Sequence, residues 1–308
     1  MDIQVEIMSA IDSAIQVSIK PKLSQILRNS EEYTNAYLES GYTDAIVGFK
    51  CRYGLGYIKE VRQEQGFNPV VADLLTAPQF NLKLNGSKVA TYGMTLAHAD
   101  ISDYELCAWR GDCTKVCVLN NGNGRYDSVR RAWIWRTHLW GKYPSVAAYR
   151  LGWELGRAVL KHGDILFRPD VNSDLSWHKC LTSLGDLPNV TVYGYTKNPA
   201  RLAHNSDEIY GNFNYCYSWN ENSNVYKVRG HLERGGKIAV VTSRKKGEPI
   251  NADALREFFG IKDFGMSFVD ADKTDEWMLS EGAVIGDLSA KGKARQLIGS
   301  STFVVNIY

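Results

Sequence analysis

Three cysteines lie close together in the chain and could hold a metal. Cys107, Cys113 and Cys117 follow the pattern C-x5-C-x3-C. Thiolates are the ligands that iron–sulfur clusters require and that zinc also accepts. Three thiolates on one loop can hold a cubane [4Fe-4S] cluster by three of its irons, which leaves the fourth iron open to a small molecule. The spacing therefore predicts a metal-binding loop, with an iron–sulfur cluster as the first hypothesis.

Zinc is the alternative metal for this loop. Its fourth ligand would come from His98, Asp103 or Asp112. Zinc sites usually contain cysteine pairs only two residues apart, and neither interval here is that short. Three unrelated buried thiols are a third explanation, which fits poorly with a loop rich in Gly, Asp, Arg and Lys. The other cysteines are scattered and are expected to be ordinary small apolar residues: Cys51, Cys180 and Cys216.

Composition narrows the class of protein. The 308 residues are 44% hydrophobic and 23% charged, which excludes a disordered chain. The 36 Lys and Arg residues against 34 Asp and Glu give a net charge of +2, so nucleic acid is not favoured as a partner. No segment approaches the roughly 18 apolar residues of a membrane span, and the first residues are acidic where a signal peptide is basic. We expect a cytoplasmic protein without membrane contact, whose reduced thiols favour metal over disulfides.

Short β-like runs alternate with helices from about residue 85. Helices are expected to begin at 127 or 128 and after Pro144, and another is expected over 252–259. The alternation predicts an α/β fold with mainly parallel strands, as a closed or incomplete TIM-like barrel over residues 85–308. A doubly wound sheet is the competing topology. Residues 1–84 are expected to form a mostly helical accessory region. The predicted strands are 89–96, 164–167, 190–193, 215–217, 238–241, 267–269 and 283–285.

Polar residues follow these predicted strands. The carboxyl ends of parallel strands meet at one edge of the sheet, and barrel enzymes have their active sites at that edge. The cysteine loop follows the first strand. Arginine and lysine at this edge could clamp an anion, and aspartate or tyrosine could move protons. The catalytic candidates are Arg168, Asp170, Asp174, Tyr195 and Lys197. Further strand-end residues are Asn220, Thr242, Ser243, Asp270 and Asp272. For any single one, a solvated loop position is the alternative.

Four other residues are candidates for binding a cofactor. Asn172 and Ser218 also follow strands, and Arg125 follows the glycine-containing turn 120–124 near the cysteines, although a plain tight turn explains the same glycines. Arg136 falls on the apolar side of its helix, where pairing with an aspartate is the default and contact with an anionic ligand is the alternative. The basic run 244–246 is interpreted as a solvated loop.

Several stretches together resemble a known family, in order from about residue 88 to 305. They are 93–100, 111–113 with 117–119, 122–129, 172–177, 193–202 and 290–294. The chain resembles a phage-encoded family of unassigned function that is distantly similar to radical-SAM barrels. The resemblance implies a location in the host cytoplasm and makes S-adenosylmethionine a conditional cofactor. Three features depart from it. Radical-SAM enzymes use C-x3-C-x2-C, which is shorter at both intervals, and no strand here ends in a glycine-rich segment for the methionine part of S-adenosylmethionine. Pro169 and Asp170 replace the usual asparagine–glycine turn.

These observations leave two hypotheses for the function. The first is an enzyme with an open-site [4Fe-4S] cluster on Cys107, Cys113 and Cys117, with chemistry of the radical-SAM type. The second is a non-catalytic metalloprotein, with a structural cluster or zinc, that acts as a phage–host interaction protein. The partner is accordingly a small molecule or a host protein. Both an enzyme and a non-catalytic protein fit these residues.

Overall fold

The computed structural model describes residues 73–80, 82–85, 87–97, 104–117, 124, 126–142, 144–180, 184–185, 187, 189–203, 212–262 and 265–307. The chain divides into two compact units. The first comprises residues 1–75, 95–104 and 123–163, and the second comprises 76–94, 105–122 and 164–308. The expected helical region 1–84 lies almost wholly outside the described residues, so a boundary after residue 84 stays a prediction.

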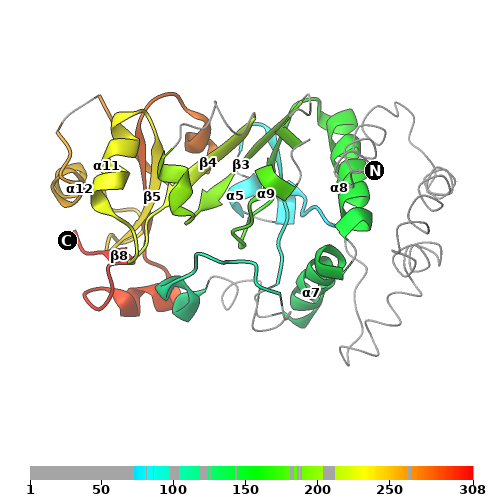
Figure 1. Cartoon of the computed structure of the whole chain (residues 1–308), viewed down its shortest axis with the longest axis horizontal. Helices are drawn as coiled ribbons and strands as arrows, with labels where there is room; N and C mark the ends of the chain where they lie inside the picture. Colours follow the sequence, from blue (N-terminus) through cyan, green and yellow to red (C-terminus); the bar gives the residue numbers. More distant parts are fainter. Residues whose placement is uncertain are drawn as a thin grey trace, which may run out of the picture. The chain divides into compact units, whose positions relative to one another are not determined.

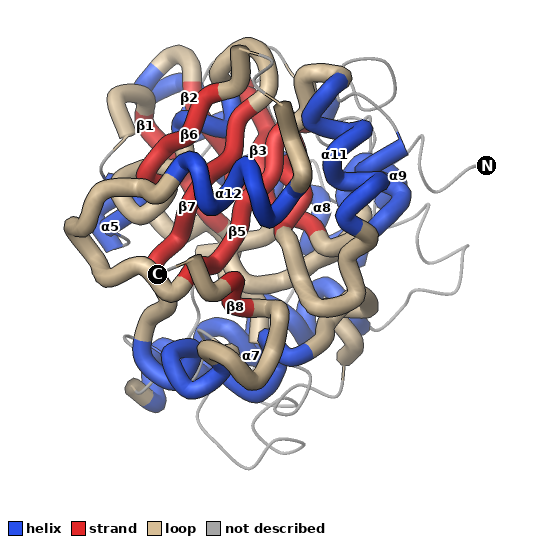
Figure 2. The backbone as a smooth tube through the Cα atoms, turned by 90° about the vertical axis from the view of Figure 1, so that its left-hand side faces the viewer, coloured by secondary structure: helices blue, strands red, loops and turns tan. Residues whose placement is uncertain are grey.

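In the part of the second unit that the structure describes, eight strands form one parallel sheet (Figures 1 and 2). Seven strands follow the order β1-β2-β3-β4-β5-β7-β6, and β8 pairs with β5, all in parallel register. The sheet curls into a half-barrel, which confirms the predicted α/β fold with parallel strands and is consistent with an incomplete TIM-like barrel. The strands are β1 (Ala90–Gly93), β2 (Ile165–Arg168), β3 (Val190–Thr196), β4 (Phe213–Ser218), β5 (Lys237–Thr242), β6 (Ser267–Asp270), β7 (Val284–Ser289) and β8 (Val304–Val305).

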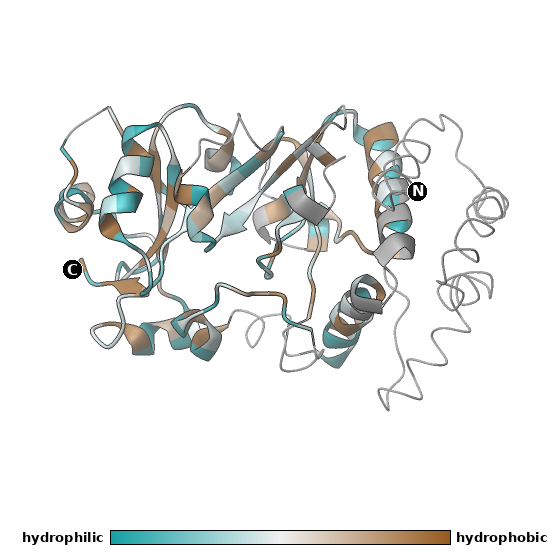
Figure 3. Ribbon diagram, in the orientation of Figure 1, coloured by the Kyte–Doolittle hydropathy of each residue, from teal (hydrophilic) through white to brown (hydrophobic). Residues whose placement is uncertain are grey.

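The strands form because their sequences are short apolar runs that can be buried on both faces. Ile238 and Val240 of β5 pack on one face with residues of α11 (Val225–Glu233) and α12 (Ala252–Phe259). Ala239 packs on the opposite face against the 3-10 helix η7 (Glu276–Leu279). The hydropathy colouring agrees, with apolar residues along the central strands and polar ones over much of α11 (Figure 3).

Short helices complete the second unit. Among its described residues, the remaining elements are η1 (Pro78–Phe80), α5 (Leu82–Asn85), η2 (Asp112–Val116), α9 (Trp177–Cys180), η6 (Pro199–Ala203) and η8 (Gly292–Leu297). Asn251 caps α12 by accepting a hydrogen bond from the Ala254 amide (3.1 Å), as expected of asparagine before a helix. Gly260 ends the same helix in the left-handed conformation, with φ 61°.

The first unit contains two packed helices, α7 (Asp127–Lys142) and α8 (Pro144–His162), which begin where the sequence predicts. Glu154 of α8 is buried, and its two carboxylate oxygens accept hydrogen bonds from the amides of Leu74 (3.0 Å) and Leu75 (2.7 Å). Arg150, one turn earlier, pairs with Glu154 at 2.8 Å. These contacts fix the segment before residue 76 to α8. Among the described residues, no helix has the length and apolar character that a bilayer span requires.

Candidate functional site

The cysteines lie on a segment that we call the cysteine strap, residues 105–117. Its first part is fastened to the loop that follows β2. The Asp174 amide donates to the Leu106 carbonyl (2.8 Å), and the Cys107 thiol faces the Asn172 carbonyl oxygen at 3.8 Å. Cys107 therefore lies at the carboxyl edge of the sheet, as the sequence predicts for the cysteine loop.

The middle of the strap is fastened to the turn that follows β4. The Asp112 amide, the first of η2, donates to Glu221 Oε1 at 2.7 Å. A Cβ atom on Gly111 would overlap that same oxygen. Glycine is therefore the one residue type that lets the strap approach this carboxylate so closely.

The last part of the strap packs on the C-terminal segment. Cys113 and Val116 of η2 belong to an apolar cluster with Ala290, Phe303 and Val304, and η2 lies against η8. In Figure 1 the teal end of the strap lies beside the red C-terminal segment. All three attachment points follow strands of one parallel sheet, so the strap runs along its carboxyl edge.

The three thiols are half-buried and free of disulfides. Across the described parts of the chain, no three His, Cys, Asp or Glu side chains converge closely enough to hold a metal ion. Burial, together with the charges of Asp174 and Asp170, raises the pKa of the Cys107 thiol to about 12. The thiol is therefore protonated at neutral pH in this conformation, and a metal would have to displace its proton.

Arg168, the last residue of β2, forms a buried ion pair across the sheet. Its guanidinium contacts Asp275 Oδ2 at 2.5 Å, and the Tyr195 hydroxyl donates to Asp275 Oδ1 at 2.7 Å. The guanidinium also lies over the Tyr195 ring, 4.9 Å from its centroid. Burial raises the pKa of Tyr195 well above its usual range, so the phenol keeps its proton. Two of the predicted catalytic residues are thus brought together by an aspartate that the sequence did not single out.

Asp170 and Asp174 stand beside Cys107 after β2. Asp170 is buried, and its Oδ1 accepts from the Ser173 hydroxyl (2.5 Å) and the Leu175 amide (3.3 Å). Burial raises the pKa of Asp170 to about 7, against the pull of Ser173. Asp174 accepts from the Thr196 hydroxyl and from the Lys197 amide at the end of β3, and burial raises its pKa as well. The structure therefore gathers these predicted residues around the first cysteine.

The other residues predicted to bind a cofactor or zinc lie in different parts of the chain. Asn172 adjoins Cys107 through its carbonyl, and Ser218 ends β4. Arg136 lies in the first unit, where its Nε donates to the Asp73 carbonyl (2.7 Å) and burial lowers its pKa to about 10. Arg125 lies outside the described residues, as do the zinc-ligand candidates His98 and Asp103. The third, Asp112, pairs with Lys115 at 2.5 Å.

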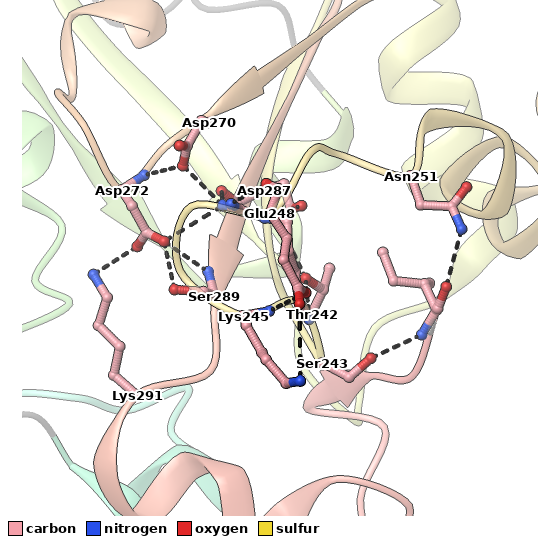
Figure 4. A network of polar contacts seen from close by, with 12 residues as sticks. Thr242, Ser243, Lys245, Glu248, Asn251, Asp270, Asp272, Asp287, Ser289 and Lys291 are labelled. Carbon is pink, nitrogen blue, oxygen red and sulfur yellow. Dashed lines mark hydrogen bonds and ion pairs between the residues drawn. The ribbon is translucent and has the colours of Figure 1, made fainter.

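A second charged network lies at the carboxyl ends of β5, β6 and β7 (Figure 4). Arg244, only 1% exposed, pairs with Asp287 (2.8 Å) and Asp270 (2.8 Å). Asp272 accepts from the Ser289 amide and hydroxyl and pairs with Lys291 at 2.6 Å. The interpretation of residues 244–246 as a solvated loop is therefore wrong for Arg244, because three aspartates on neighbouring strand ends surround it.

Glu221 is a site residue that the sequence did not predict. Its neighbouring residues look like those of an ordinary polar turn, so no local pattern singles it out.

Comparisons with curated proteins and with solved structures find no match. The family model described as gene product 88 matches residues 71–306. The matched region contains the whole strap and the whole parallel sheet, in agreement with the resemblance to a phage-encoded family. The chain therefore belongs to the gene product 88 family.

Proposed function

We propose that the protein carries a metal site on Cys107, Cys113 and Cys117, with a [4Fe-4S] cluster as the group that they hold. The observation that supports this best is the attachment of the cysteine strap along the carboxyl edge of the sheet. Parallel α/β sheets place their ligands at that edge. A loop with a purely structural role would not need three cysteines along that edge.

The thiols must be drawn together for a metal to bind, because they do not converge in the present conformation. Cys113 and Cys117 are carried by the short 3-10 helix η2 and the residue that follows it. A helix of this kind is a weak element that can change its geometry at low cost. The strap would close on the metal while its attachments after β2 and β4 keep it at the sheet edge.

An enzymatic role is the form of the proposal that the surrounding residues favour. A cluster held by three thiolates offers an open iron to a small molecule. A buried ion pair and a hydrogen bond join Arg168, Asp275 and Tyr195, and this group would form the floor of such a site. Asp170 titrates near neutral pH and could exchange protons with a bound molecule, and the half-buried Lys197 could hold an anionic group.

The test is metal content after anaerobic purification of the full chain. We expect brown protein with about four irons per chain. Cys107→Ala, Cys113→Ala and Cys117→Ala should each lose most of this iron. Cys216→Ala is the matched control, because Cys216 is a buried core residue of β4 and should not affect the iron. Colourless protein with stoichiometric zinc would contradict the cluster and leave the zinc interpretation.

S-adenosylmethionine is the conditional part of the proposal. Reduced, cluster-loaded protein would be mixed with this cofactor and the solution analysed for 5′-deoxyadenosine. Formation of that product in the wild type, but not in Cys107→Ala, is the expected result for radical chemistry. A cluster that yields no 5′-deoxyadenosine would remove S-adenosylmethionine and keep the metal site.

A further inference from the structure

We propose that Glu221 is a positioning residue, which holds the cysteine strap in register on the sheet edge so that Cys113 is presented beside Cys107. The role of Glu221 in metal binding rests on the proposed metal site. The contact between Glu221 and the strap does not depend on a metal, because it is present in the metal-free chain.

Glu221 is carried by a rigid turn. Asn220, which is buried, accepts from the Asn222 amide through its side chain (2.9 Å), and its own amide donates to the Ser223 hydroxyl (2.9 Å). The preceding residue, Trp219, donates its indole N–H to the Thr302 carbonyl at 2.8 Å. The turn is thus fixed both to itself and to the C-terminal segment, so the Glu221 carboxylate has a defined position.

The carboxylate makes a contact that η2 cannot supply for itself. Gly111 precedes η2 and offers no side chain to its free amides. Glu221 Oε1 fills that role from a position 109 residues away in sequence by accepting from the Asp112 amide. A charged acceptor on a backbone amide is among the stronger hydrogen bonds in proteins.

The second carboxylate oxygen of Glu221 argues against a purely stabilising role for this residue. Among the described residues, Glu221 Oε2 is buried without a hydrogen-bond partner. A buried carboxylate oxygen without a donor carries a desolvation cost. A glutamine at this position could make the same bond to the Asp112 amide without burying a charge, which gives the experiment a conservative variant.

The first measurement uses the metal-free full chain and needs no ligand. Brief exposure to iodoacetamide, followed by mass spectrometry, gives the alkylation rate of each cysteine. We expect Glu221→Ala to raise the rates at Cys113 and Cys107 several-fold, because the strap detaches from the β4 turn. Glu221→Gln should stay near the wild-type rates. Glu233→Ala, which removes an exposed carboxylate from the end of α11, is the control and should change neither rate.

Gly111 allows a second variant that does not touch Glu221. Gly111→Ala should raise the same rates, because the added methyl group displaces the carboxylate. In the Glu221→Ala background it should add little, since the clashing group is gone. Equal alkylation rates in wild type, Glu221→Ala and Gly111→Ala would overturn the proposal, as would additive effects in the double variant.

The second measurement connects the position of the strap to metal binding. Iron-loaded wild type and Glu221→Gln should retain iron under a chelator for longer than Glu221→Ala does. Equal retention by all three would overturn the role of Glu221 at the metal site. If the wild type takes up no metal while the alkylation rates behave as expected, the metal site fails and the positioning contact stands.

Discussion

At the scale of single residues, burial changes the behaviour of Asp170 most clearly. Its folded-state pKa is raised to about 7 by burial, from an ordinary value of 3.8. Between these two values the folded state binds more protons than the unfolded state does. The free energy of unfolding therefore falls as the pH rises through this interval, and the loss is complete above pH 7. Ionisation of Asp170 therefore lowers the stability of the folded state. Residues with pKa values shifted in this way are common at functional sites.

Asp170→Asn should remove this pH dependence. The amide oxygen can still accept from Ser173 and Leu175, but the side chain cannot become charged. Relative to the metal-free wild type, we expect the variant to gain about 3 kcal/mol more unfolding free energy at pH 8 than at pH 4.5. Urea denaturation at the two pH values measures this difference. Asp253→Asn, whose side chain is 95% exposed, is the control and should give the same small change at both. An equal change for Asp170→Asn would refute the assignment.

The sequence predicts residues of the site better than it predicts their contacts. The spacing of the cysteines and the position of polar residues after strands led to Cys107, Asp170 and Asp174, which do lie together. It did not lead to Asp275 or Glu221. Each contacts a partner more than 100 positions away, and such a pairing leaves no periodic or local pattern in a single chain.

At the scale of elements, η7 decides how one face of the sheet is closed. Trp277 and Met278 of this short helix pack against residues from β2, β3, β4, β5 and β7. The Trp277 ring lies directly on the backbone of Gly286 in β7, where a Cβ atom would overlap it. Gly286 is thus needed for a close approach between two elements, although glycine within a strand is otherwise unfavourable.

Gly286→Ala should therefore destabilise the fold by about 1–3 kcal/mol, the usual cost of overpacking a core. The matched control is Gly194→Ala in β3, where the added methyl would meet the Tyr215 ring at 3.4 Å, near ordinary contact distance. It should change the unfolding free energy much less. Urea denaturation measures both variants, and equal destabilisation would show that loss of backbone freedom, and not the tryptophan, explains the glycine.

Most strands and the two long helices could be predicted, because buried parallel strands are continuous apolar runs bounded by turn residues. The two-residue strand β8 was missed, since Val304–Val305 is too short to produce a pattern. Helix α11 was also missed, although Asn224 before Val225 and Val228 is a recognisable start signal. The reversed order of β6 and β7 could not be predicted, because strand order depends on packing between distant segments.

At the scale of the whole sheet, Arg244 joins strand ends that are neighbours only in space. It follows β5 and pairs with Asp270 at the end of β6 and with Asp287 within β7. Thr242 donates to the other oxygen of Asp287 at 2.7 Å. Burial raises the pKa of Asp287, even with the guanidinium beside it. Arg244 therefore links the three strands at this edge by pairing with the buried Asp287 and the half-buried Asp270.

Arg244→Leu should leave these carboxylates buried without their cation and lower the unfolding free energy at pH 8 by about 3–5 kcal/mol. The loss should be smaller at pH 5, because Asp287, whose pKa is raised by burial, can then take up a proton that relieves the charge. Lys245→Leu removes the neighbouring basic residue, an exposed side chain paired with Glu248 at 3.9 Å, and should cost less than about 1 kcal/mol at either pH. Urea denaturation of both variants at the two pH values makes the comparison. A loss in Arg244→Leu that does not depend on pH would mean that Arg244 stabilises the sheet by packing alone, and not by neutralising the aspartates around it.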